Sequence, residues 1–177
     1  MRVFAGLALN QKVKRELWYA ALRARELFPG RYADKENYHC TLAFIGEVDQ
    51  VSLAPIRQAL AEAAEGCASL PITLSGLSYF GRREGAILFC ALQASPALQG
   101  LAESVQRKLR AAGLPLDDAP FRAHITLARQ AKLDSASLSQ IKVAPLTQQM
   151  DALTLFESAR VEGKLQYLPL FTCPLGK

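Results

Sequence analysis

The chain contains two histidines, and both open the same four-residue pattern. His39–Leu42 reads HCTL and His124–Leu127 reads HITL. In a strand, side chains alternate between faces, so each histidine shares a face with its threonine, while the leucine lies on the other face. Two imidazoles suit in-line displacement at phosphorus, because one takes a proton from the nucleophile while the other gives a proton to the leaving oxygen. A histidine near its ordinary pKa of about 6.5 can hold either state near neutral pH.

The threonines of the two motifs complete this chemistry. The hydroxyls of Thr41 and Thr126 can donate hydrogen bonds to non-bridging phosphate oxygens, where negative charge accumulates in the transition state. The scheme needs no metal. A zinc hydrolase is a poor alternative, since two histidines without an HExxH motif or a carboxylate cluster leave the coordination shell incomplete. A lone histidine would be read as structural, but a duplicated motif with no other histidine in the chain argues for catalysis.

Further candidate contacts follow the motifs. Phe44 and Arg129 each lie five residues after a histidine and offer a ring for a base and a cation for phosphate. In a regular strand this odd offset places them on the face opposite the histidines, so packing and solvent exposure remain equal alternatives. Other residues could line a nucleotide pocket or rim a cleft, although packing and solvation are the commoner roles: Tyr38, Phe80, Phe121, Arg31, Arg82, Arg83 and Arg122.

The elements that must position these residues follow from periodicity and capping signals. Asn10 is predicted to cap the helix that follows the first strand, and Ser95, Pro96 and Gly113 to bound a later helix. The predicted strands cover residues 2–9, 38–46, 70–80, 86–92 and 121–129, with a hairpin of 150–160 and 164–173; the predicted helices cover 11–28, 52–64, 95–113 and a short 135–141.

The two halves of the chain repeat this order. The spacing from Phe4 to His39 is 35 residues, and so is the spacing from Phe89 to His124. A unit that long, occurring twice, predicts an α+β fold in which duplicated strand-helix-strand units form two lobes about a pseudo-twofold axis. Two antiparallel sheets would then face a central cleft, within a single domain spanning residues 1–177, each lobe carrying one HxTL motif.

The amino-acid composition excludes a disordered chain and indicates the kind of partner. Half of the 177 residues are hydrophobic, which excludes disorder, and a net charge of +5 (21 basic against 16 acidic residues) favours a polyanionic partner. The four widely spaced cysteines predict free core thiols in a reducing compartment. No signal peptide or membrane span is recognisable, so the expectation is a cytoplasmic protein without membrane contact.

The motifs identify a resemblance that covers nearly the whole chain. The signatures HCTLAFIG and HITLAR, the opening RVFAGLAL, the segment SGLSYFG and the closing LFESARVEGKLQYLPL resemble the 2H phosphoesterase superfamily. Within it, the chain is similar to the LigT-like RNA 2′,3′-cyclic phosphodiesterases, also called 2′-5′ RNA ligases. The resemblance implies a bilobal α+β fold, a two-histidine site without metal or cofactor, and hydrolysis of a terminal 2′,3′-cyclic phosphate to a 2′-phosphomonoester.

The resemblance also implies a role for each motif residue. His39 matches the proton donor to the leaving 3′ oxygen, His124 matches the proton acceptor that activates water, and Thr41 and Thr126 match the phosphate-holding threonines. The residues alone leave the two histidine roles interchangeable. The expected partners are RNA ends or nucleotides with a 2′,3′-cyclic phosphate, and no obligate protein partner is expected, so a monomer is predicted. Two alternatives stay open: an ATP-independent 2′-5′ RNA ligase using the same site, and a non-catalytic RNA- or nucleotide-binding module.

Overall fold

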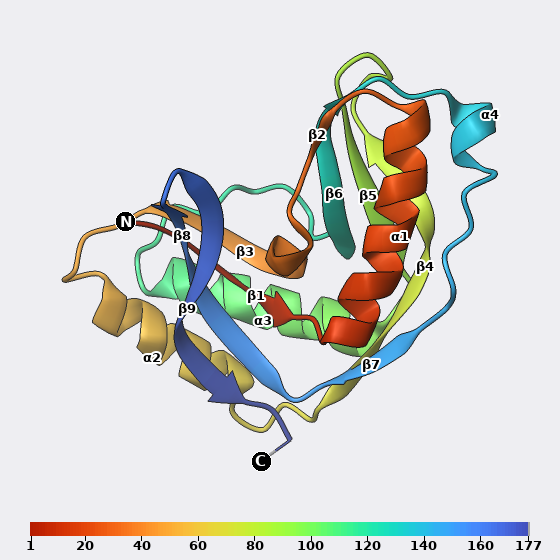
Figure 1. Cartoon of the computed structure of the whole chain (residues 1–177). Helices are drawn as coiled ribbons and strands as arrows, with labels where there is room; N and C mark the ends of the chain where they lie inside the picture. The colour runs from red at the N-terminus through yellow and green to blue at the C-terminus, as the bar shows by residue number, and fades with distance from the viewer. Residues whose placement is uncertain (177) are drawn as a thin grey trace.

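The strands form two antiparallel sheets in the computed structural model, which describes residues 1–176 (Figure 1). The first sheet has the order β3 (His39–Glu47), β1 (Arg2–Ala8), β8 (Ala152–Val161), β9 (Lys164–Pro174). The second has the order β2 (Arg31–Tyr32), β6 (His124–Ala131), β5 (Ala86–Leu92), β4 (Leu70–Phe80), β7 (Thr147–Met150). Each motif therefore begins a strand in a different sheet, and the predicted α+β class with two antiparallel sheets is confirmed.

The helices begin where the capping residues predict. Asn10 Oδ1 accepts a hydrogen bond of 2.9 Å from the N–H of Val13, and Ser95 Oγ accepts one of 3.1 Å from the N–H of Leu98. Gly113, with φ +87°, follows the helix that it is predicted to end. The helices are α1 (Gln11–Leu27), η1 (Lys35–Asn37, a 3₁₀ turn), α2 (Leu53–Ala64), α3 (Pro96–Ala111) and α4 (Ser135–Leu138).

The two long helices each cover the sheet that does not contain the preceding strand. α1 follows β1 of the first sheet but packs against β6 of the second, whereas α3 follows β5 of the second sheet but packs against β3 of the first (Figure 1). Gln106 of α3 donates a hydrogen bond of 3.0 Å to the carbonyl of Leu42 in β3. Because the halves exchange helices in this way, the buried side chains of both sheets join in one hydrophobic cluster.

Both motif strands contain a bulge at the leucine of the motif. In the first sheet Thr41 pairs with Gly6 but Ala43 pairs with Ala5, which leaves Leu42 without a partner. In the second sheet the same irregularity leaves Leu127 without a partner, between the pairs of Thr126 and Ala128. A bulge inserts one extra residue, so the side chains beyond it change face relative to a regular strand.

Some local features differ from the predicted ones. The motif strands begin at the histidines themselves, and β2, η1 and β7 are short elements that no periodic pattern marked. The cysteines are free, as predicted, and three are buried, but Cys67 is half-buried at the surface. No helix within residues 1–176 is long and apolar enough to cross a membrane.

Candidate active site

The ring of His39 is held through both of its nitrogens. Nδ1 lies 2.7 Å from the carbonyl oxygen of Asn37, and Nε2 lies 2.8 Å from Oγ1 of Thr41. A carbonyl oxygen can only accept, so Nδ1–H donates to it, and the neutral ring then has a bare Nε2 that accepts from the threonine hydroxyl. Nε2 is therefore the nitrogen left for chemistry at this site.

Aromatic rings enclose His39 on the side of the first sheet. Its ring centroid lies 4.6 Å from that of Phe4, 6.2 Å from that of Phe156, and 4.9 Å from that of Tyr167, which meets it edge-on. Burial among these rings lowers the pKa of His39 to about 4, against the opposing effect of the hydrogen bond to Asn37. His39 is therefore neutral at neutral pH in the free protein.

His124 has the same backbone anchor and a more open ring. Its Nδ1–H donates a hydrogen bond of 2.6 Å to the carbonyl of Arg122, and Phe80 and Phe89 meet the ring edge-on at 5.0 and 5.3 Å. Among the described residues, none hydrogen-bonds its Nε2. Burial lowers the pKa of His124, and the positive charges of Arg129 and Arg122 lower it further.

The two motif strands contact each other, and the two imidazoles influence each other electrostatically. β3 and β6 are in contact, and the charge on a protonated His124 lowers the pKa of His39. The positive charge of Arg129 lowers the pKa of both histidines. The pKa of each histidine is therefore lowered from its ordinary value, because both rings are desolvated and share a cationic neighbour.

The two motif threonines lie beside their histidines but differ in the hydrogen bonding of their hydroxyl groups. Both are half-buried, and in each strand the residues on either side of the threonine are buried in the core. The hydroxyl of Thr41 is engaged by His39, whereas the side chain of Thr126 has no hydrogen bond to any residue from 1 to 176. The free hydroxyl of Thr126 can donate to a bound anion at once, and that of Thr41 can do so when Nε2 of His39 acquires a proton.

The bulges place Phe44 and Arg129 on the exposed face of their strands. Leu42 and Ala43 are both buried, so the alternation changes phase there, and Phe44 is 48% exposed with the guanidinium of Arg2 4.8 Å above its ring. Arg129 follows two buried residues in the same way and is exposed. The strand-parity argument against these two residues was therefore wrong, since it assumed strands without bulges.

A second arginine stands beside Arg129. Arg31 of β2 is its direct cross-strand partner, and both side chains are exposed. Like charges directly opposite one another destabilise a sheet pair, and a bound anion would relieve this repulsion. Tyr38, in contrast, is buried in the core and lines no nucleotide pocket.

Asn37 and Tyr167 belong to the site although the sequence did not reveal them. The side-chain amide of Asn37 donates a hydrogen bond of 2.9 Å to the carbonyl of Leu165, and its Oδ1 accepts one of 3.3 Å from the N–H of Tyr167. Asn37 thus ties the strand that carries Tyr167 to the loop that orients His39. Its contact with His39 uses a backbone carbonyl, which any residue type can supply, so no sequence signal marks it.

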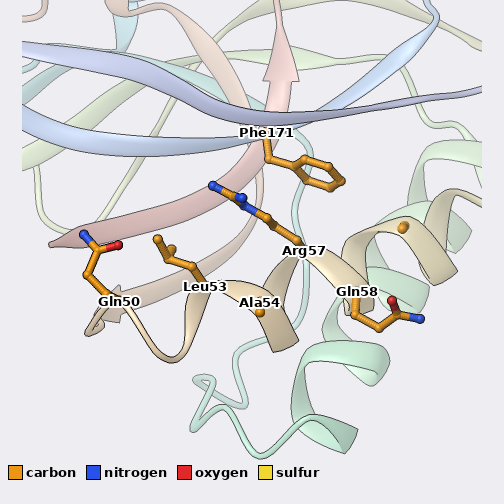
Figure 2. Close-up of a pocket in the computed structure, with 7 residues that line it drawn as sticks. Gln50, Leu53, Ala54, Arg57, Gln58 and Phe171 are labelled. Atoms are coloured by element: carbon orange, nitrogen blue, oxygen red, sulfur yellow. The ribbon is translucent and has the colours of Figure 1, made fainter.

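The possible metal ligands and a hollow in the surface also concern ligand binding. No group of three or more His, Cys, Asp or Glu side chains that could hold a metal ion occurs in the part of the chain that the structure describes. A hollow of about 470 Å³ lies between α2 and β9, where Arg57 extends toward the ring of Phe171 (Figure 2). It contains neither histidine and no pair of titratable groups.

Comparison with known proteins gives consistent matches. The family model of the 2′-5′ RNA ligase superfamily matches residues 13–162. An RNA 2′,3′-cyclic phosphodiesterase of Geobacillus stearothermophilus is 33% identical over 129 residues, which is 72% of this chain and only 41% of that relative's length. An RNA 2′,3′-cyclic phosphodiesterase of Thermotoga maritima is 25% identical over 178 residues, covering 98% of this chain and 95% of the relative.

Solved structures share the fold. A protein of Thermus thermophilus is 25% identical with a TM-score of 0.78, and the match covers 99% of this chain and 98% of that chain. Escherichia coli LigT, in a crystal structure with 3′-AMP, has a TM-score of 0.81 at 23% identity with the same coverage. The second likeness shows the fold alone.

Proposed function

Because the chain belongs to the 2′-5′ RNA ligase superfamily, we propose that it is an RNA 2′,3′-cyclic phosphodiesterase that hydrolyses a terminal 2′,3′-cyclic phosphate to a 2′-phosphomonoester. The observation that carries the proposal is the shared anchoring of the two imidazoles. In each, Nδ1–H is bound to a backbone carbonyl, so Nε2 is the working nitrogen of both rings. In-line displacement at phosphorus requires two such nitrogens, one to take a proton and one to give a proton.

His124 is the proton acceptor in this scheme. Its Nε2 bears a lone pair in the neutral ring and has no hydrogen bond to another described residue. A water oxygen attacks phosphorus while Nε2 of His124 takes the proton that this oxygen loses. The lowered pKa keeps the ring in the basic form in the free protein.

His39 is the proton donor. The bond from phosphorus to the 3′ oxygen breaks, and Nε2–H of His39 gives its proton to that oxygen, which leaves a 3′-hydroxyl and a 2′-phosphate. With a pKa of about 4 the free protein seldom holds this proton, but a bound phosphodiester anion stabilises the imidazolium and raises the pKa. The substrate itself therefore prepares the acid.

The threonines and Arg129 bind the charged oxygens. Thr126 donates to a non-bridging oxygen, and Thr41 does so once His39 is protonated and no longer accepts its hydroxyl hydrogen. Arg129, which already influences both histidines electrostatically, supplies a positive charge beside them, and Phe44 offers an exposed ring to a base. The substrates proposed are RNA ends and nucleotides that carry a 2′,3′-cyclic phosphate.

The test is incubation with an oligonucleotide ending in a 2′,3′-cyclic phosphate, followed by identification of the product, with and without excess chelator. We expect a 2′-phosphate and full activity in chelator, since the scheme needs no metal. Activity lost on chelation and restored by zinc or manganese would contradict the two-imidazole mechanism. Joined 2′-5′ products, formed with a second oligonucleotide bearing a 5′-hydroxyl and without ATP, would identify the ligase use of the same atoms, and binding without conversion would identify a binding module.

The setting of the enzyme is also part of the proposal. Four free cysteines suit a reducing, cytoplasmic environment. The exchanged helices and the single buried cluster support one domain of two lobes. We propose that this domain acts as a monomer.

A further inference from the structure

A pocket of about 480 Å³ opens beside His124. Phe80 and Phe89 line it, and both of these rings also contact the imidazole of His124, at centroid distances of 5.0 and 5.3 Å. Two rings that line the pocket are therefore direct neighbours of the imidazole that we assign as the general base. The pocket continues over the start of α3, so a molecule reacting at His124 can extend into it.

One wall of the pocket is a flat cation. The guanidinium carbon of Arg122 lies 4.6 Å from the centroid of Phe80, and the side chain is exposed. Phe80 is in turn supported by Phe89, whose ring centroid is 4.1 Å away. The exposed guanidinium thus rests on the half-buried ring of Phe80, which packs on the buried ring of Phe89. The carbonyl of the same residue orients His124, which fixes this wall relative to the reacting atoms.

The remaining walls combine an aromatic ring with amides. Phe121 is half-buried and lines the pocket, and the side chains of Gln93 and Gln99 are exposed at its edge. Arginine planes and aromatic rings are surfaces on which nucleobases stack, and amides can meet the hydrogen-bonding edges of a base. A purely apolar ligand would make no use of the cation and the amides, and a bare phosphate would make no use of the rings.

From this arrangement we propose that the pocket between β4, β5 and the start of α3 is a nucleobase subsite in which a base stacks on Arg122. The inference rests on the proposed function, since it assigns one part of the same substrate. The base can come from two sources. One is the nucleoside that carries the cyclic phosphate, and the other is the nucleoside whose 5′-hydroxyl takes the place of water in 2′-5′ ligation.

The test compares a substrate with a base and one without it. Steady-state hydrolysis of 2′,3′-cyclic AMP is measured beside that of glycerol 1,2-cyclic phosphate, which has the same reacting ring and no base. Ala94→Trp fills the pocket from an exposed position, and Arg122→Lys keeps the charge but removes the stacking plane. Ala54→Trp, at an exposed position in the hollow on α2, is the matched control.

We expect both pocket variants to raise KM for 2′,3′-cyclic AMP on the order of 10-fold, a typical effect of losing one stacked base. In Ala94→Trp the kcat for both substrates and the KM for the glycerol compound should stay unchanged, and Ala54→Trp should behave as the unmodified protein. This result assigns the base of the reacting nucleoside to the pocket at Arg122 and not to the ring of Phe44. If the KM values are unchanged but the variants no longer transfer the phosphoryl group to the 5′-hydroxyl of adenosine, the base in the pocket is that of the incoming nucleoside. No change in either assay overturns the subsite.

A binding measurement separates this inference from the proposed function. Calorimetry of 2′-AMP and of inorganic phosphate needs no turnover. Weaker binding of 2′-AMP to Ala94→Trp, with unchanged binding of inorganic phosphate, supports the subsite even if the protein hydrolyses neither cyclic phosphate. Equal affinity of Ala94→Trp and the unmodified protein for 2′-AMP, together with unchanged kinetics, contradicts it.

Discussion

His39 and His124 begin identical motifs, yet the protein surrounds them differently. His39 is enclosed by Phe4, Phe156 and Tyr167, and its Nε2 accepts from Thr41. His124 has an Nε2 without a hydrogen bond to the described residues and contacts two rings, Phe80 and Phe89, that line a pocket. The motif supplies the imidazole, and the residue two positions before it supplies the backbone carbonyl that anchors the ring. The neighbouring strands determine the solvent access and the pKa of each ring. In the proposed function the two copies of the motif take different roles, one as the acid and one as the base.

The largest effects should come from the histidines themselves. His39→Ala and His124→Ala should each lower kcat by roughly 10²–10⁴-fold, the usual contribution of general acid–base catalysis. The double variant should be little worse than either single variant, because both groups act in one displacement. The measurement is steady-state hydrolysis of a 2′,3′-cyclic nucleotide by all four proteins.

A good leaving group separates the two roles. A nitrophenyl phosphodiester loses nitrophenolate without protonation, so it should largely rescue His39→Ala and leave His124→Ala slow. The opposite rescue pattern would mean that donor and acceptor are exchanged. Equal rescue of both variants would mean that the histidines only bind phosphate.

The difference between the two sites could not be read from the sequence. The fold class and the caps at Asn10 and Ser95 follow from residue types and spacing, and the structure confirms them. The enclosure of His39 depends on Phe156 and Tyr167, which lie more than a hundred residues further along the chain. Only tertiary packing brings those rings to the imidazole.

The bulges explain why the positions of Phe44 and Arg129 could not be predicted from the sequence. HCTLAF and HITLAR contain no glycine or proline at the bulge, so nothing in them predicts that Leu42 and Leu127 stand outside the ladder. That one-residue shift turns Phe44 and Arg129 to the exposed face. The packing of α1 and α3 against the opposite sheets could not be predicted either. Hydrophobic periodicity shows which face of a helix is buried, but it does not show which sheet that face packs against.

The threonines should give the next largest effect. Thr126→Ala should lower kcat on the order of 10²-fold by removing one hydrogen bond to the transition state. Thr41→Ala should cost more, because it also removes the hydroxyl that holds Nε2 of His39 in place. Serine at either position keeps the hydroxyl and should be milder, which single-turnover rates can establish. Full activity of both alanine variants would reduce these threonines to strand-forming residues.

The positive charges near the two histidines should affect the pKa of His39 and the pKa of His124 differently. Lys14 lowers the pKa of His39, whereas Arg129 lowers the pKa of both histidines. Lys14→Gln should therefore raise the pKa of His39 alone, and Arg129→Gln should raise both values. NMR titration of the two imidazoles in the substrate-free protein measures this directly. An equal change in the pKa of His124 in both variants would contradict this expectation.

The same shifts set the pH dependence of activity. Displacement needs one protonated and one neutral imidazole, and both pKa values lie below the ordinary value of about 6.5. The bell for kcat/KM, which reports the free enzyme, should therefore centre on the acid side of pH 6.5, with limbs that belong to the coupled pair. The bell for kcat should lie at higher pH, since the bound phosphodiester anion favours the imidazolium. A kcat/KM optimum above pH 7 would contradict the desolvated environment of the two rings.

The smallest expected effect on activity tests how closely the first sheet supports His39. Gly6 pairs with Thr41, and a Cβ there would lie 2.8 Å from the carbonyl oxygen of Cys40 and 3.6 Å from Cδ2 of His39. Gly6→Ala must therefore move β1 away from β3, at a cost of about 1–3 kcal/mol in the free energy of unfolding, typical of overpacking. The corresponding partner of Thr126 is Phe89, so the second sheet has no such close approach.

Gly6→Ala should consequently lower kcat by a few-fold through His39 alone. Denaturant unfolding measures the loss of stability, and NMR should show the His39 signal displaced with the His124 signal in place. Gly100→Ala is the matched control, because Gly100 lies in α3 with no atom within 4 Å of the added Cβ, and alanine stabilises a helix by about 0.5–1 kcal/mol relative to glycine. If Gly6→Ala moved both histidine signals equally, the two sheets would respond as one body and the contrast between the sites would not depend on local packing.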